Sequence, residues 1–117
     1  IIGHSLNHRN GLIDWFLGSQ GQVYGYTKVF WNGVTTLQWS KECFELMKYW
    51  ENYQADTIIS SEKISKFDLL EKIKKVYGKK IEILPKSSLE RDECLEGLIQ
   101  APDIESQLNS LRKFYGL

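Results

Sequence analysis

The sequence predicts an α/β or α+β fold, with about three or four short strands packed with four or five helices. Two observations support this class. Runs rich in β-branched and aromatic residues alternate along the chain with stretches whose apolar residues recur at helical spacing. These strands are too few for a self-contained doubly wound sheet. A length of 117 residues suits one domain, and we expect residues 1–117 to form it.

The central segment, residues 57–84, carries the clearest pattern of strand, helix and strand. Ser65 and Asp68 have the spacing of a capping box, which predicts a helix that begins at Ser65. Gly78 supplies the left-handed residue that ends a helix. Short β-branched runs at 57–59 and 81–84 flank this helix.

Breaker residues follow the second of these strands. Pro85 prevents it from continuing as a central strand. The polar stretch 87–93 is expected to be a surface connection. Leu95, Leu98 and Ile99 then suggest a short helix, and Pro102, at a first helical position, opens a final helix that Gly116 ends.

The first half of the chain predicts two helices around one β-rich stretch. Asn10 and Gly11 precede a helix over 11–18, and residues 22–31 form one strand or two short strands bent at Gly25. After a turn at Asn32-Gly33, Thr35 or Thr36 caps a long helix that continues to about Tyr49 or Trp50. Its predicted buried stripe consists of Leu37, Ser40, Phe44, Met47 and Trp50.

Composition narrows the class of protein. Fifteen basic and fifteen acidic residues are interspersed, so no charged surface for nucleic acid or an anionic membrane is predicted. No apolar run approaches the roughly 20 residues that span a bilayer. Cys43 and Cys94 are expected to be buried reduced thiols in helices, which indicates a reducing, cytoplasmic location. Because the chain lacks a starting Met, we expect a piece of a longer protein whose catalytic part lies upstream.

Motifs for catalysis or metal binding are weak. Tyr24 and Lys28 match Tyr-x-x-x-Lys, but a strand would place the two side chains roughly 13 Å apart instead of one helical turn apart. His4 and His8 have a zinc-like spacing, but they stand in a sequence typical of a loop. No Cys-x-x-Cys pair, nucleophile elbow, Walker loop or dinucleotide glycine fingerprint occurs.

Aromatic residues cluster in and after the predicted strand. They are Tyr24, Tyr26, Phe30, Trp31 and Trp39. This cluster is expected to be mainly core, with stacking on a sugar or base as the alternative. A binding role is as well supported as a core role for Lys28, Trp31 and Asn32, because they lie where a strand meets a turn.

The order of motifs resembles the carboxy-terminal, substrate-binding part of extended short-chain dehydrogenase/reductases of the dTDP-4-dehydrorhamnose reductase type. The segments are "IIGHSLNHRNGLIDWFLGSQGQVYGYTKVFWNGVTTLQWSKE" and "ISSEKISKFDLLEKIKKVYGKKIEILP", within residues 1–85. In that family a separate Rossmann half binds NAD(P)H and carries the Tyr-x-x-x-Lys pair. The resemblance therefore implies a lobe without catalytic or cofactor-binding residues, in which residues 57–84 are scaffold.

The resemblance also implies partners and a site. The whole protein would reduce the 4-keto group of a nucleotide-linked deoxysugar, and this lobe would contact the nucleotide-linked sugar and the Rossmann half. The expected substrate-binding residues are Asn10, Gly11, Lys28, Trp31 and Asn32.

Two other functions compete with the lobe. One is a stand-alone interaction or ligand-binding module with an aromatic-rich surface, for which a monomer without a large exposed apolar patch would be evidence. The other is a small enzyme that uses His4, His8 or Asp14, although no second catalytic group is predicted near them.

Overall fold

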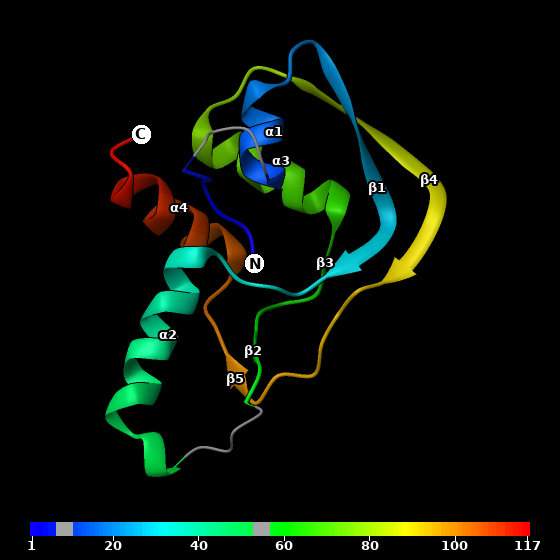
Figure 1. Ribbon diagram of the computed structural model, residues 1–117. Coiled ribbons are helices and arrows are strands. Elements are labelled where there is room, and N and C mark those ends of the chain that lie inside the picture. Colours follow the sequence, from blue (N-terminus) through cyan, green and yellow to red (C-terminus); the bar gives the residue numbers. More distant parts are fainter. Residues whose placement is uncertain (7–10, 53–56) are drawn as a thin grey trace.

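The computed structural model describes residues 1–6, 11–52 and 57–117, and Figure 1 shows their arrangement. The predicted α/β class is confirmed. The helices and strands are α1 (Leu12–Gly18), β1 (Gln22–Trp31), α2 (Thr36–Lys48), a 3-10 turn (Trp50–Asn52), β2 (Ile59–Ser60), β3 (Ile64–Ser65), α3 (Lys66–Tyr77), β4 (Glu82–Asp92), β5 (Ile99–Gln100) and α4 (Ile104–Phe114). No helix in these three ranges is long and apolar enough to cross a membrane.

The strands form two small sheets. In the larger sheet, of order β3-β1-β4, β1 pairs antiparallel with β3 and parallel with β4. The smaller sheet is the parallel pair of β2 and β5. β1 runs as one strand without a break at Gly25, and it positions the aromatic side chains discussed below.

The length of β4 corrects the prediction of a surface connection over residues 87–93. Pro85 stands in this strand opposite Gly25, which is possible because β4 lies at the edge of the sheet, where a residue without an N–H is tolerated. The strand continues to Asp92, so most of the polar stretch 87–93 is strand instead of a surface connection. The register shifts opposite 26–28, where β4 accommodates extra residues.

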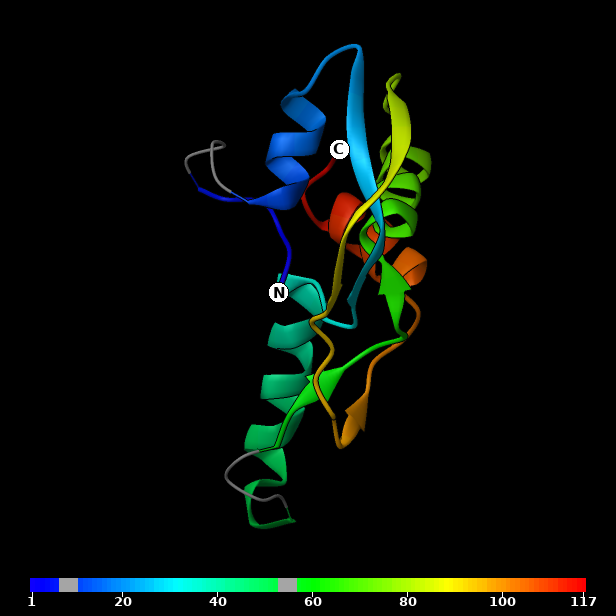
Figure 2. The same ribbon diagram turned by 90° about the vertical axis from the view of Figure 1, so that its right-hand side faces the viewer.

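The core lies between β1, α1, α3 and α4. Ser65 caps α3 by accepting a hydrogen bond from the Asp68 N–H at 3.0 Å, and Gly78 ends the helix with a φ of 65°, as predicted. α3 packs on β1 and against α4 (Figures 1 and 2). The fully buried apolar residues are Ile13, Phe16, Leu69, Ile73, Ile104, Leu108 and Leu111.

The predicted buried stripe of α2 is wrong. The helix begins as expected after Thr35, whose hydroxyl accepts a hydrogen bond from the Gln38 N–H at 3.2 Å. It has no buried residue, however, and Figures 1 and 2 show it projecting from the rest of the molecule. The amphipathic pattern is present, but only its first residue, Leu37, packs against the core, and Phe44, Met47 and Trp50 are exposed.

The expected helix around Leu95 and Ile99 is also absent. Ile99 pairs with Ile59 in the parallel pair, and the Asn32 side chain binds the backbone of Leu95. Gly97 fits closely on β2, because a Cβ atom there would lie 2.2 Å from the Ser60 Oγ. These long-range contacts override the local apolar spacing.

The final helix begins two residues later than expected. Asp103 is the N-cap of α4 and accepts a hydrogen bond from the Ser106 N–H at 2.9 Å. Pro102 precedes the cap, and its carbonyl accepts a hydrogen bond from the buried Gln107 amide. Gln107 also accepts from the Thr35 N–H at 3.0 Å, which joins α4 to the start of α2.

Candidate functional site

The described members of the predicted substrate-binding set lie at the start of α1 and in and just after β1. Asn10 lies outside the described residues. Gly11 is the exposed N-cap of α1, with a φ of 105°, and Lys28 is exposed on β1. Trp31 and Asn32 stand at the end of β1. None of the four described residues lines the apolar pocket between α1, β1, the start of α3 and β4.

Trp31 and Asn32 have structural partners. Trp31 is buried in the core, and Gly33 lies against its ring so closely that a Cβ atom would be 2.4 Å from Cζ2. The Asn32 side chain donates to the Leu95 carbonyl at 2.7 Å and accepts from the Leu95 N–H at 2.9 Å. Both side chains are therefore occupied in positioning the end of β1.

An apolar pocket of about 270 Å³ lies between α1, β1, the start of α3 and β4. We call it the aromatic pocket. Tyr24 and Trp15 remain 56% and 49% exposed, so their rings are accessible at its edge. Its lining residues are Leu12, Trp15, Tyr24, Tyr26, Val29, Lys66, Leu70, Leu89 and Glu93.

Charged groups border the aromatic pocket. The Lys66 ammonium lies 3.5 Å from a Glu93 carboxylate oxygen, and both residues line the pocket. The Lys86 ammonium stands 4.8 Å from the centre of the Tyr24 ring. Apolar walls with a few convergent charged groups are typical of small-molecule sites. The volume suits one ring, such as a sugar or a base, more than a complete nucleotide sugar.

Sequence reasoning found part of this pocket. Tyr24 and Tyr26 belong to the predicted aromatic cluster, whereas Trp15, Lys66 and Glu93 were missed. One sequence signal for Trp15 was available: it is a large aromatic residue of α1 that does not belong to the buried pair Ile13 and Phe16. Nothing in the sequence brings Lys66 to Glu93, which is 27 residues away.

His4 forms a buried hydrogen-bond cluster. Its Nδ1 lies 2.9 Å from an Asp14 carboxylate oxygen and its Nε2 lies 2.8 Å from the Tyr77 hydroxyl. The other Asp14 oxygen accepts from the Ser5 N–H and hydroxyl. Burial alone would raise the pKa of Asp14, but these hydrogen bonds lower it below its usual value. The Tyr115 ring meets His4 edge-on.

We interpret this cluster as structural, because its side chains are largely buried and bond to one another. Both nitrogens of His4 are occupied, so neither is available to a zinc ion, and His8 lies outside the described residues. Burial raises the pKa of Tyr77 to about 12, although Arg112 acts in the opposite direction. A phenol with a raised pKa is a poorer proton donor. The cluster joins the N-terminal segment to α1 and α3.

We expect the stability of the chain to fall at alkaline pH through Tyr77. Its folded pKa of about 12 exceeds the value of about 10 for an unfolded tyrosine. Folding therefore favours the neutral phenol, so its contribution is complete below pH 10 and is lost as the pH rises toward 12. Urea unfolding from pH 8 to 11.5 measures this. Tyr77→Phe should show a flatter decline, whereas the exposed Tyr49→Phe should behave as the parent chain does.

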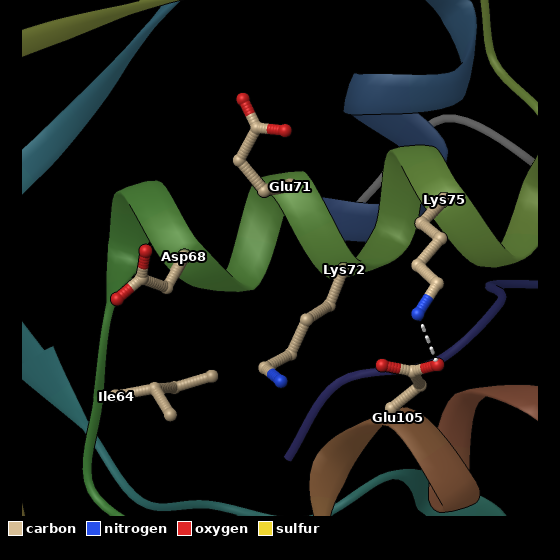
Figure 3. Close-up of a pocket in the computed structure, with 6 residues that line it drawn as sticks. All are labelled: Ile64, Asp68, Glu71, Lys72, Lys75 and Glu105. Carbon is tan, nitrogen blue, oxygen red and sulfur yellow. Dashed lines mark hydrogen bonds and ion pairs between the residues drawn. The ribbon is translucent and has the colours of Figure 1, made fainter.

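A larger groove of about 490 Å³ lies between α3 and α4 (Figure 3). Figure 3 shows Lys72 and Lys75 extending toward α4, whereas Glu71 points to the opposite side of α3. Lys75 pairs with Glu105 at 2.7 Å. The residues that line this groove carry charges of both signs, and only Ile64 among them is apolar. We therefore interpret the groove as a solvated surface between two helices.

Other reactive groups are also engaged. Hydrogen bonds from Lys63 and then from Cys94 lower the pKa of Asp92 to about 2. Burial, followed by the hydrogen bond with Asp92, raises the pKa of the Cys94 thiol, which disfavours its nucleophilic form. Cys43 and Cys94 are free thiols and both are partly buried. Cys94 lies between β4 and β5 rather than in the expected helix. Within the described ranges, no group of three or more acidic, His or Cys residues is arranged to hold a metal.

The exposed apolar side chains on and just after α2 form a surface that we call the α2 face, consisting of Trp39, Phe44, Met47 and Trp50. Phe44 is 59% exposed and Met47 and Trp50 are each 72% exposed. An exposed apolar surface of this kind is what the lobe hypothesis predicts and the stand-alone module does not.

Because the α2 face exposes apolar side chains, we expect the isolated chain to self-associate as its concentration rises. Phe44→Gln together with Met47→Gln should lower the association measured by sedimentation velocity. Because neither side chain is buried, the free energy of unfolding should change by less than about 0.5 kcal/mol. Lys41→Gln, also exposed on α2, is the control. Equal association of all three chains would contradict the prediction.

Comparison with known proteins supports the fold. No protein-family model and no curated protein matches the chain. A dTDP-4-dehydrorhamnose reductase from Bacillus anthracis str. Ames, solved in complex with NADP, matches with a TM-score of 0.71 at 13% identity. The reductases of this name from Yersinia enterocolitica and Clostridium acetobutylicum ATCC 824 match with TM-scores of 0.65 and 0.67, at 14% and 10% identity.

The match is nearly complete for this chain and partial for the reductases. It covers 90%, 88% and 92% of this chain but only 43%, 41% and 45% of the Bacillus, Yersinia and Clostridium reductases. The chain thus spans less than half of their length. The resemblance noted in the sequence is confirmed at the level of fold: the chain has the fold of part of dTDP-4-dehydrorhamnose reductase.

Proposed function

We propose that this chain is the substrate-binding lobe of an NAD(P)-dependent sugar-nucleotide oxidoreductase, and that the aromatic pocket receives the nucleotide-linked sugar. The observation that carries the proposal is an accessible aromatic pocket in a chain with the fold of part of a sugar-nucleotide reductase. The rings of Tyr24 and Trp15 offer faces on which a base or sugar ring stacks. Lys66 and Lys86 offer donors to hydroxyl or phosphate oxygens.

The described residues do not fit a dinucleotide cofactor. Such a site needs a glycine-rich turn between a parallel strand and a helix, where the backbone can approach a pyrophosphate. The turn after β1 carries Gly33, but the Trp31 ring already lies against it. The proposed function therefore assigns NAD(P)H, the hydride and the catalytic proton donor to a separate cofactor-binding half, and this lobe contributes substrate binding and orientation.

Ligand titration tests the proposal. We expect amide chemical shifts of the aromatic pocket, including those of Trp15 and Tyr26, to move with a dTDP-sugar or UDP-sugar. NADPH should produce no shift there. Comparison of the two nucleotide sugars identifies the base. Perturbation by NADPH at the pocket, or no response to either nucleotide sugar, would contradict the proposal.

Substitution at the pocket predicts a measurable loss. Tyr24→Ala removes an exposed ring and should weaken nucleotide-sugar binding about tenfold or more, because base–aromatic stacking contributes about 1–3 kcal/mol. Isothermal titration calorimetry measures the dissociation constant. Tyr49→Ala removes a similarly exposed tyrosine at the end of α2, outside the pocket, and should leave binding unchanged. Equal affinities of the two variants would be evidence against stacking on Tyr24.

A further inference from the structure

The two long strands of the larger sheet do not pair residue for residue. Tyr26 pairs with Lys86, and the next pair along the two strands is Lys28 with Glu90. Residues 87–89 of β4 thus stand opposite a single residue of β1, and we call them the β4 bulge. Bulges re-aim side chains and are over-represented next to functional sites, so they are designed features rather than defects.

One residue of the β4 bulge faces the aromatic pocket. Leu89 is partly buried and lines the pocket, whereas Ser87 and Ser88 are exposed. In the described part of the chain, Leu89 belongs neither to the buried core nor to the partly buried apolar residues that pack against it. Its side chain therefore contributes to the wall of the pocket rather than to the core.

Protection of the strand edge does not account for Leu89. An open edge strand can pair with another chain, and bulges, prolines and lysines oppose such pairing. Pro85 and Lys86 already stand in β4 directly before the bulge. Edge protection also gives no reason for an apolar residue that lines a pocket.

The charged groups of the aromatic pocket favour the base as the ring that it holds. Glu93 lines the pocket beside Lys66, and a carboxylate repels a diphosphate. A base presents donors and acceptors on one edge, which a carboxylate and an ammonium can bind together. Because the proposed function assigns the hydride to a separate half, the reacting sugar has to extend away from this pocket.

We propose that Leu89 determines the ring size that the aromatic pocket accepts, and that the β4 bulge holds this side chain in position to do so. The inference rests on the proposed function, because it concerns the same pocket. With Leu89 in place the pocket measures about 270 Å³, and Tyr24 and Trp15 provide its aromatic surfaces. A single-ring base is accommodated there, whereas the second ring of a fused base meets the leucine side chain.

UDP and ADP are matched probes of this size limit. They differ only in the base, and both uracil and adenine present a donor beside an acceptor on one edge. The pair of Lys66 and Glu93 can bind either edge, so it does not choose between the two bases by itself. A difference in affinity therefore reports the size of the ring.

Isothermal titration calorimetry of the 117-residue chain with UDP and ADP tests the proposal. The parent chain should bind UDP about tenfold or more tightly than ADP, since a misfit of one methylene in an apolar pocket already changes affinity about 10–200-fold. Leu89→Ala should abolish most of this preference by strengthening the binding of ADP. Leu89→Met, which nearly conserves the volume, should retain the preference.

Leu84→Ala is the control for Leu89→Ala. Leu84 is a partly buried leucine of the same strand that does not line the pocket, so its variant should keep the preference of the parent chain. Equal binding of UDP and ADP by the parent chain would overturn the inference. The same preference in Leu89→Ala as in the parent chain, or equal effects of Leu89→Ala and Leu84→Ala, would also overturn it.

The size limit and the proposed function fail in different ways. If the parent chain binds a dTDP-sugar or UDP-sugar but not UDP, the base does not occupy the pocket, and only the inference on Leu89 is overturned. If the chain binds neither nucleotide sugar, the proposed function is overturned together with the inference.

Discussion

Asp14→Ala is expected to destabilise the chain by about 3 kcal/mol, because it removes the carboxylate that binds the Ser5 N–H, the Ser5 hydroxyl and the His4 ring. The Asp14 carboxylate is 2.7 Å from the Ser5 N–H, 2.9 Å from the Ser5 hydroxyl and 2.9 Å from the His4 Nδ1. The side chains of His4 and Asp14 are only 6% and 7% exposed, so water does not replace the lost acceptor. Urea unfolding at pH 7 measures the loss.

The Asp14 carboxylate also makes the free energy of unfolding depend on pH in the acid range. The folded pKa of Asp14 is below its value of about 3.9 in an unfolded chain. Its contribution is therefore present above pH 4 and is lost as the pH falls through the folded pKa. In Asp14→Asn, which does not titrate, the free energy of unfolding should decline less steeply below pH 4 than in the parent chain.

Asp68→Ala is the matched control for Asp14→Ala. Both acids stand in the first turn of a helix, so both substitutions remove a favourable interaction with the helix dipole, worth about 0.5 kcal/mol. Asp68 is exposed, and its variant should lose only that amount. If the two variants lose the same stability, the His4 cluster does not contribute what its geometry indicates.

The sequence correctly predicted the ends of those helices that neighbouring residues determine. Ser65 and Gly78 delimit α3 in the sequence because the cap hydrogen bond and the left-handed end involve neighbouring residues. The fate of α2 was not predictable in this way. Its apolar spacing shows that one face is apolar, but periodicity does not tell which surface covers that face. The predicted helix around Leu95 does not form, because the side chain of Asn32, 63 residues earlier, binds the Leu95 backbone.

In the candidate site, too, contacts between distant residues were not predictable from the sequence. The aromatic cluster of residues 22–31 was expected to be mainly core, with stacking on a ligand as the alternative, yet Tyr24 is 56% exposed. Trp31 was expected to be as suited to binding as to the core, yet it lies on the buried side of the same strand. Lys66 and Glu93 come together only through the fold, because α3 and β4 both approach β1. Pairings between distant segments decide which aromatic residues become a pocket.

Gly25→Val is expected to cost about 3 kcal/mol or more, since α3 crosses β1 too closely for any side chain at this position. A Cβ atom there would lie 2.8 Å from the Phe67 Cδ2 and 3.1 Å from an Ile83 methyl group, which side-chain movement could relieve. It would also lie 3.0 Å from the Phe67 Cα, and the backbone of α3 can yield only if the helix moves away from the sheet. The high β-propensity of valine does not offset this displacement.

Gly18→Ala separates this steric effect from the general cost of replacing glycine. Gly18 is the last residue of α1, and no atom lies within 4 Å of a Cβ placed on it. Its replacement should leave stability unchanged or raise it by about 0.4–1 kcal/mol, since alanine restricts the unfolded chain. Gly25→Ala should fall between Gly18→Ala and Gly25→Val in urea unfolding, because its single methyl group still meets the Phe67 backbone. A Gly25→Val chain as stable as the parent would mean that α3 does not pack on β1 as closely as the structure shows.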